Sequence, residues 1–171
     1  MISFRKIFAD ELGRLCPAGE EVVDVISAQY HPGLEREPDE SNTVTFDPIN
    51  GLNVSSWNDS AEQLVGGLTL DTRRGHQAVG LARAFMTGSN LVLTTRRLLV
   101  IGHVSSDTTP EVAWEGPLSS IEAITHDPRF PLELCRIRVN CADGSMVRLW
   151  CGVLPWAARR FVASFVSTAS R

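Results

Sequence analysis

The sequence lacks the features that mark membrane-spanning and secreted chains. It contains no run of 18 apolar residues, the length that a membrane-spanning helix needs. Its first apolar stretch is interrupted by Arg5 and Lys6 and followed by acidic residues, unlike the hydrophobic segment of a signal peptide. We therefore expect a protein that stays in the cytoplasm.

Cysteine patterns typical of metal sites are also missing. The chain has four cysteines, but neither a CxxC pair nor another metal-ligand spacing occurs among them. Cys135, Cys141 and Cys151 fall in apparent strands, where cysteine packs as a small apolar residue. We expect no metal and no cofactor. We also expect Cys135 and Cys151 to be neighbouring, buried and reduced, as in a cytoplasmic compartment.

The short motifs of known catalytic sites are absent from the sequence. Its histidines lie singly, without an HExxH pattern, and it has no Gly-x-Ser-x-Gly. These histidines are His31, His76, His103 and His126. The basic turn Asp71-Thr-Arg-Arg-Gly-His76 lacks the GxxxxGK[ST] spacing of a phosphate-binding loop. We therefore predict a protein that is not an enzyme, with an anion site in this turn as a minor alternative.

Lysine is nearly absent, since arginine supplies 15 of the 16 basic residues. The net charge of −4 gives no support for nucleic-acid binding. Residues 1–71 carry 13 acidic and 4 basic side chains, whereas residues 72–171 carry 7 acidic and 12 basic ones. This asymmetry predicts either internal complementarity or a face that attracts anions. Solvated charges with no particular role are the alternative.

Apolar residues at helical spacing predict helices near residues 3–15, 59–68, 78–85 and 155–169. The N-terminal helix is amphipathic, so we expect it to pack on the body of the protein or on a second subunit. Binding to a membrane surface is the alternative, which the mixed polar face of Asp10, Glu11 and Arg14 disfavours. Pro155 suits the first turn of the last helix.

The remaining apolar runs predict strands. In Leu91–Ile101 two such runs flank a possible chain reversal, so that Leu93 opposes Leu98 and Leu91 opposes Val100. Seven strands are predicted in all, near residues 21–30, 89–94, 97–103, 111–115, 119–126, 133–141 and 145–152. The spacing within residues 21–30 also fits a helix, which is the alternative there. Residues 31–41 are predicted as a loop, and Gly116-Pro117 is predicted to end a strand.

The turn of the last predicted hairpin, between residues 133–141 and 145–152, predicts which residues of its two strands pair. Ala142-Asp143-Gly144 fits a three-residue loop with glycine at its left-handed position. This register places all the β-branched and leucine side chains on one face, and it pairs Cys135 with Cys151. On the other face Arg138 opposes Arg148, and Arg136 opposes Trp150.

Opposed arginines destabilise a sheet unless something offsets their repulsion. Solvent, an acidic partner or the acidic N-terminal half of the chain could each do so. We therefore take Arg136, Arg138, Arg148 and Trp150 as candidate binding residues for a partner or an anion. A purely internal pairing of these arginines is the alternative.

Three segments resemble bacterial pleckstrin-homology-like (PH-like) domain proteins: LVLTTRRLLVIG at 91–102, WEGPLSSIEAI at 114–124 and RIRVNCADGSMVRLW at 136–150. The resemblance implies a mainly β (α+β) fold. It would be a seven-stranded antiparallel PH-like barrel or sandwich capped by the C-terminal helix at 155–169. The whole chain, 1–171, would be one domain, in which residues 32–88 form a loop and helical insertion between the first two strands.

The resemblance says little about function, but the absence of catalytic motifs together with the basic face and the strand edges leads us to expect a non-catalytic binding or assembly module. We expect it to recognise a protein or peptide partner, an acidic one at the basic face, or to self-associate into a homo-oligomer. Edges of antiparallel sheets can also accept added peptide strands. Peripheral membrane or anionic-lipid binding is the alternative. The acidic first loop, with Glu35, Glu37, Asp39 and Glu40, disfavours an anionic headgroup.

Overall fold

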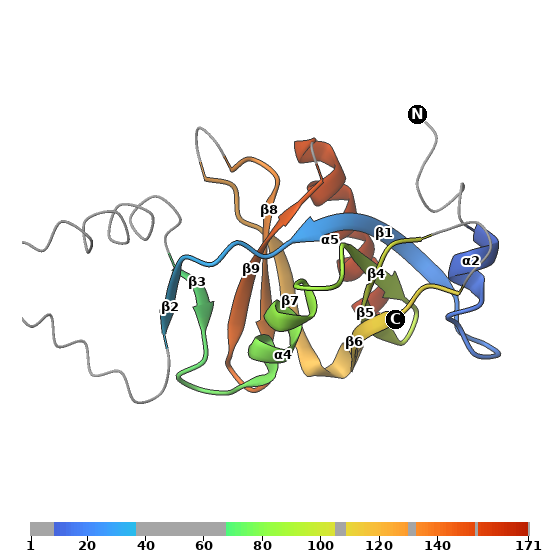
Figure 1. Cartoon of the computed structure of the whole chain (residues 1–171), viewed down its shortest axis with the longest axis horizontal. Helices are drawn as coiled ribbons and strands as arrows, with labels where there is room; N and C mark the ends of the chain where they lie inside the picture. The colour runs from blue at the N-terminus through green and yellow to red at the C-terminus, as the bar shows by residue number, and fades with distance from the viewer. Residues whose placement is uncertain (1–8, 37–67, 105–108, 130–132, 153, 171) are drawn as a thin grey trace, which may run out of the picture.

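The computed structural model describes residues 9–36, 68–104, 109–129, 133–152 and 154–170, without the side chains of Leu34 and Arg36 (Figure 1). Its elements are α2 (Ala9–Gly13), β1 (Val22–Gln29), β2 (Leu34–Arg36), β3 (Leu68–Asp71), α4 (Gln77–Ala84), β4 (Asn90–Thr94), β5 (Arg97–Ile101), β6 (Val112–Pro117), the 3-10 turn η1 (Leu118–Ser120), β7 (Ile121–His126), β8 (Arg136–Cys141), β9 (Met146–Cys151) and α5 (Pro155–Ala169).

The first group of strands is an antiparallel meander of β1, β4, β5 and β6. The predicted central hairpin is confirmed, since Leu93 pairs with Leu98 and Leu91 with Val100. All five residues of β4 are buried: the apolar Leu91, Val92 and Leu93, and the polar Asn90 and Thr94 at its ends. This hairpin is therefore a buried centre of the sheet.

The second group consists of β7, β8 and β9. The predicted register of the last hairpin is confirmed, with Val139 opposite Val147 and Arg138 opposite Arg148. Gly144 has φ +83°, the left-handed conformation that the three-residue loop requires. Side chains alternate between buried and half-buried along β8, so one face of this hairpin enters the core.

Strand β1 connects the two groups. Its first part pairs with β4 and its last two residues, Ala28 and Gln29, pair with β9. In the described part of the chain the sheet order runs from β2 through β3, β9, β1, β4 and β5 to β6, with β8 and β7 beside β9. The fold is thus mainly β with a C-terminal helix, as predicted, but the sandwich is open rather than a closed barrel.

Two helices bury their apolar sides on opposite faces of the strands. Helix α5 contributes Ala158, Phe161 and Phe165 to the core between the two groups of strands. Helix α2 instead adds Leu12 to a smaller cluster with Val92 and others, on the other face of the first group. The helix predicted at 155–169 is confirmed. Residues 3–8 of the predicted N-terminal helix lie outside the described residues.

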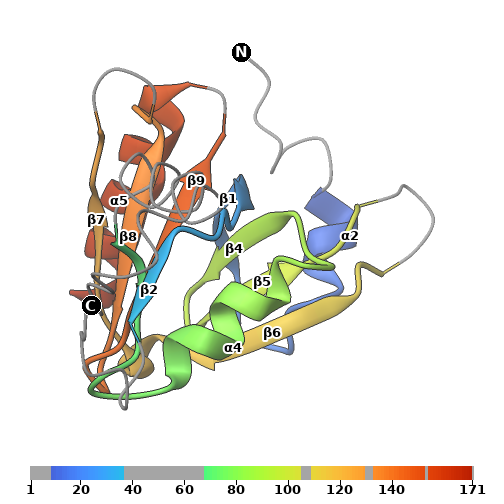
Figure 2. The same cartoon turned by 60° about the vertical axis from the view of Figure 1, so that its left-hand side comes forward.

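Helix α4 closes the end of the sandwich near the β8–β9 turn; Figure 2 shows it running beside β6. Its first backbone N–H groups are capped from far along the chain. Gln77 N donates to the Asp143 carboxylate at 2.9 Å, and Ala78 N donates to the Ser145 hydroxyl at 3.0 Å. A carboxylate of the protein itself therefore accepts from the helix start that follows the basic turn at 71–76.

Removing this cap is expected to destabilise α4. Partial burial would raise the pKa of Asp143, but hydrogen bonds from Ser145, Gln77 and His76 lower it below its ordinary value. The stabilisation is therefore present above the unfolded pKa of about 3.9 and lost as the pH falls through the lower folded pKa. We expect Asp143→Ala to lose about 1–2 kcal/mol at pH 7. Urea unfolding at pH 7 and at pH 3 checks this, since the difference between the two proteins must shrink at pH 3.

Four details of the predicted elements are wrong. The structure has nine strands among its described residues, because the predicted insertion at 32–88 contributes β2 and β3 as well as α4. Strand β2 lies within the predicted loop, where its parallel pairing with β3 outweighs the turn-forming composition. Leu68 begins β3 rather than ending a helix, and the rest of the predicted helix at 59–68 lies outside the described residues.

The predicted break at Gly116-Pro117 is the fourth error, because β6 continues through both residues. Leu118 N donates to Arg96 O, so alternate residues of β6 face β5 and Pro117 faces the open edge. A missing N–H costs no ladder bond there, which is why an edge strand tolerates proline.

None of the four cysteines forms a disulfide bond in the structure. Cys135 and Cys151 lie opposite each other, linked by a backbone hydrogen bond from Cys151 N to Cys135 O, and both are buried. Burial raises the pKa of both thiols, and it raises that of Cys141 to about 11. Cys16 is half-buried.

We therefore expect a thiol reagent to modify Cys16 first and the three strand cysteines only at the rate of unfolding. Mass spectrometry of the native protein after timed labelling checks the order. Cys16→Ser serves as the control, and rapid labelling of that variant would contradict the prediction.

Candidate functional site

The predicted candidate residues lie together on the outer face of the β8–β9 hairpin. Arg136 and Arg138 project from β8, and Arg148 and Trp150 project from β9, opposite the side chains that enter the core. The structure thus brings all four together, as the register predicts.

Acidic residues from the β7–β8 connection hold two of these arginines. The Nε atom of Arg148 donates to Asp127 Oδ2 at 2.6 Å, and Arg148 also donates to the carbonyl oxygen of Leu68. Arg136 forms an ion pair with Glu133 at 2.5 Å and lies 3.8 Å from Asp127. Their acidic partners therefore lie in the second half of the sequence, rather than in the acidic first half.

Asp127 stays ionised because of its neighbours. Partial burial would raise its pKa, but the hydrogen bond from Arg148 and the charges of Arg148, Arg136 and Arg138 lower it below the ordinary value. One carboxylate thus faces three guanidinium groups. Asp127 and Glu133 together carry two negative charges against the three arginines, so this surface has an excess of positive charge.

The excess is located on Arg138. Among the described residues this half-buried side chain has no ion-pair partner, and its Nε atom is buried without a hydrogen bond. The hydroxyl oxygen of Thr125, its cross-strand neighbour on β7, is likewise buried and unpartnered. Buried polar atoms without partners cost free energy, and the charge of the Arg138 guanidinium has no counterion among the described residues.

Trp150 adds an aromatic surface. Its ring is 38% exposed and makes an edge contact with His31, at a centroid distance of 5.2 Å. A small cleft of about 50 Å³ opens there, lined among others by His31, Pro32, Arg136 and Trp150. An exposed tryptophan beside arginines is a combination enriched at protein interfaces.

A larger, mainly apolar pocket of about 330 Å³ lies on the other side of Pro32. It is lined by Tyr30, which follows β1, and by residues of β2, β3 and α4, including Leu70 and Val79. Burial and a hydrogen bond to Glu35 raise the pKa of Tyr30, so its hydroxyl remains a donor. Sequence reasoning missed this pocket because the segments that form it are far apart along the chain.

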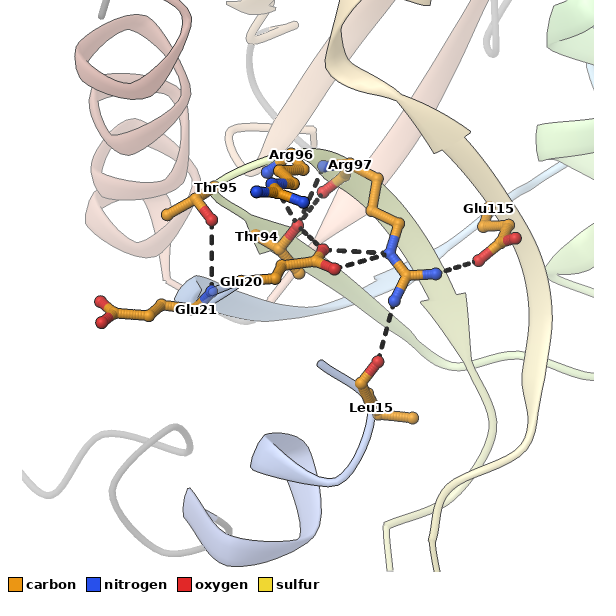
Figure 3. A network of polar contacts seen from close by, with 8 residues as sticks. All are labelled: Leu15, Glu20, Glu21, Thr94, Thr95, Arg96, Arg97 and Glu115. Carbon is orange, nitrogen blue, oxygen red and sulfur yellow. Dashed lines mark hydrogen bonds and ion pairs between the residues drawn. The ribbon is translucent and has the colours of Figure 1, made fainter. Parts of the chain in front are cut away.

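A polar network around Glu20, just before β1, and Arg97 serves a structural purpose (Figure 3). The Glu20 side chain, only 2% exposed, accepts from Arg97 Nε at 3.0 Å and from the Thr94 hydroxyl. Arg97 also donates to the carbonyl oxygen of Leu15 at 2.8 Å and to Glu115. These contacts tie the segment after α2 to β5 and β6, and they leave Arg97 fully engaged.

The exposed edge of β6 is poorly suited to accept an added strand. A bulge interrupts it, since Val100 pairs with Trp114 whereas Ile101 pairs with Val112. Pro117 removes a donor from the same edge. Bulges and prolines are the devices that protect edges from pairing. Peptide addition at this edge is therefore less favoured than binding at the arginine surface.

Neither a scan against models of protein families nor a search of curated proteins found a match. In the described ranges, no group of three or more histidine, cysteine or acidic side chains could hold a metal ion. None of the helices that the structure describes is both long and apolar enough to cross a membrane.

Proposed function

We propose that the chain is a PH-like, non-catalytic binding or assembly module that recognises an acidic segment of a protein partner. Two features of the fold support the PH-like assignment. A four-stranded meander precedes a three-stranded one, with β1 contributing to both, and a long helix follows at the C-terminus. The resemblance of segments 91–102, 114–124 and 136–150 to bacterial PH-like proteins points the same way.

The observation that carries the binding proposal is the charge balance of the outer face. Arg136 and Arg148 are held by Asp127 and Glu133, whereas Arg138 has no ion pair within the described residues. A carboxylate of a partner would neutralise this charge, and the neighbouring Trp150 would supply apolar contact. Arg136 and Arg148 are then supporting residues, and Arg138 makes the contact.

Charge reversal at Arg138 tests the proposal. We expect Arg138→Glu to weaken binding of a fluorescein-labelled polyglutamate peptide by about tenfold or more, measured by fluorescence polarisation at low salt. Binding to the wild-type chain should itself weaken as salt rises. Arg138 has no ion pair to lose, but its charge favours the ionised Asp127, so thermal melts should show a modest loss, and binding is compared at a temperature where both proteins are folded.

Arg159→Glu is the matched control, since Arg159 is exposed on α5 and undergoes the same change of charge. Equal losses in the two variants would show only an effect of net charge and would reject the site. Binding of vesicles containing phosphatidylserine, without binding of the peptide, would reject a protein partner in favour of a membrane. A fall in the mass measured by light scattering for Arg138→Glu alone would identify the partner as a second copy of the chain.

A further inference from the structure

The pocket beside α4 combines an apolar interior with two charged side chains, Glu35 and Arg83. Its volume of about 330 Å³ lies in the range of sites that take a small molecule or a large side chain. Leu70 is buried, and Val79 and Phe85 are half-buried, so these side chains form its walls. Met86 is 86% exposed, as expected of a rim residue.

Two charged side chains line the same pocket, but only one of them has a partner. Glu35 accepts a hydrogen bond from the Tyr30 hydroxyl. Arg83 is exposed, and in the described part of the chain it has neither an ion pair nor a hydrogen bond from its side chain. The Tyr30 hydroxyl is neutral, so Glu35 keeps its negative charge, and an acidic group that enters with an apolar side chain must lie on the side of Arg83.

The pocket and the arginine surface are continuous. Pro32 lines both the apolar pocket and the cleft that contains Arg136, Arg148 and Trp150. An extended segment that crosses Pro32 would meet Arg83 at the pocket and, beyond the cleft, Arg138, the cross-strand neighbour of Arg148.

We infer that the pocket accepts an apolar or aromatic anchor side chain of the same acidic partner segment, with Arg83 binding the carboxylate next to the anchor. This inference rests on the proposed function and adds to it the requirement for an anchor residue. An anchor in a preformed pocket supplies most of the affinity of many interfaces, while charges orient the segment.

Two acidic heptapeptides test the inference on the full chain. Both alternate Glu and Asp, with Phe at the centre of one and Ala at the centre of the other. We expect the Phe peptide to bind about tenfold more tightly to the wild-type protein, measured by fluorescence polarisation. Val79→Trp fills the pocket and should abolish this difference, whereas Arg159→Glu should preserve it.

The variants separate this inference from the proposed function. Arg138→Glu should weaken both peptides by the same factor, and Arg83→Glu should weaken the Phe peptide more than the Ala peptide. If Val79→Trp proves unfolded in thermal melts, the Arg83→Glu comparison decides alone. Equal affinity of the two peptides for the wild-type protein, with binding still dependent on Arg138, overturns the pocket and leaves the charge site standing. Failure of both peptides to bind overturns both proposals.

Discussion

Arg97→Ala is expected to lower the free energy of unfolding by about 3–5 kcal/mol, because it leaves the buried Glu20 carboxylate without its cation. The same change removes the hydrogen bond to the Leu15 carbonyl and the ion pair with Glu115. A loss of this size lowers the melting temperature of a domain of this length by roughly 10 °C. Denaturant unfolding monitored by tryptophan fluorescence measures it.

Two further variants give this prediction a control. Arg96→Ala removes the neighbouring arginine, which is exposed, so its effect should stay within about 0.5 kcal/mol. Glu20→Leu combined with Arg97→Met removes both charges at once and should recover much of the loss, since the desolvation cost of Glu20 disappears. If Arg97→Ala is no worse than Arg96→Ala, the network in Figure 3 does not stabilise the fold.

Sequence reasoning succeeded where the deciding interactions are local. The register of β8 and β9 follows from a three-residue turn and the alternation beside it, and that of β4 and β5 follows from two apolar runs and a short reversal. The relative positions of Arg138 and Arg148 follow from the register alone. The placement of these arginines beside each other could therefore be predicted from the sequence, without knowledge of any tertiary contact.

The rest of the candidate site depends on contacts between distant segments. Asp127 and Glu133 belong to a connection too long to fix its own register, so their pairing with Arg148 and Arg136 had no sequence signal. Strand β3 was missed for a similar reason: its pairing with β2 and β9 is long-range. The negative charge of the N-terminal half suggested that its carboxylates pair with the arginines. That was wrong, because net charge says nothing about where individual charges lie in the fold.

Asp127→Asn is expected to change stability and binding in opposite directions. The substitution removes the ion-pair partner of Arg148 and one of the two acidic neighbours of Arg136, so we expect a loss of about 2–3 kcal/mol at pH 7. The loss should disappear in acid. The folded pKa of Asp127 is lowered, so its stabilisation is present above the unfolded pKa of about 3.9 and is lost as the pH falls through the folded value.

The same variant should bind an acidic peptide more tightly, because the carboxylate that competes for the three arginines is gone. We expect roughly a fivefold gain in affinity, equivalent to about 1 kcal/mol, in the polarisation assay at low salt. Asp10→Asn, the same change of charge on the exposed side of α2, should alter neither quantity. Lower stability with unchanged or weaker binding would mean that Asp127 only holds the sheet together, and that the arginine surface is not where an anionic partner binds.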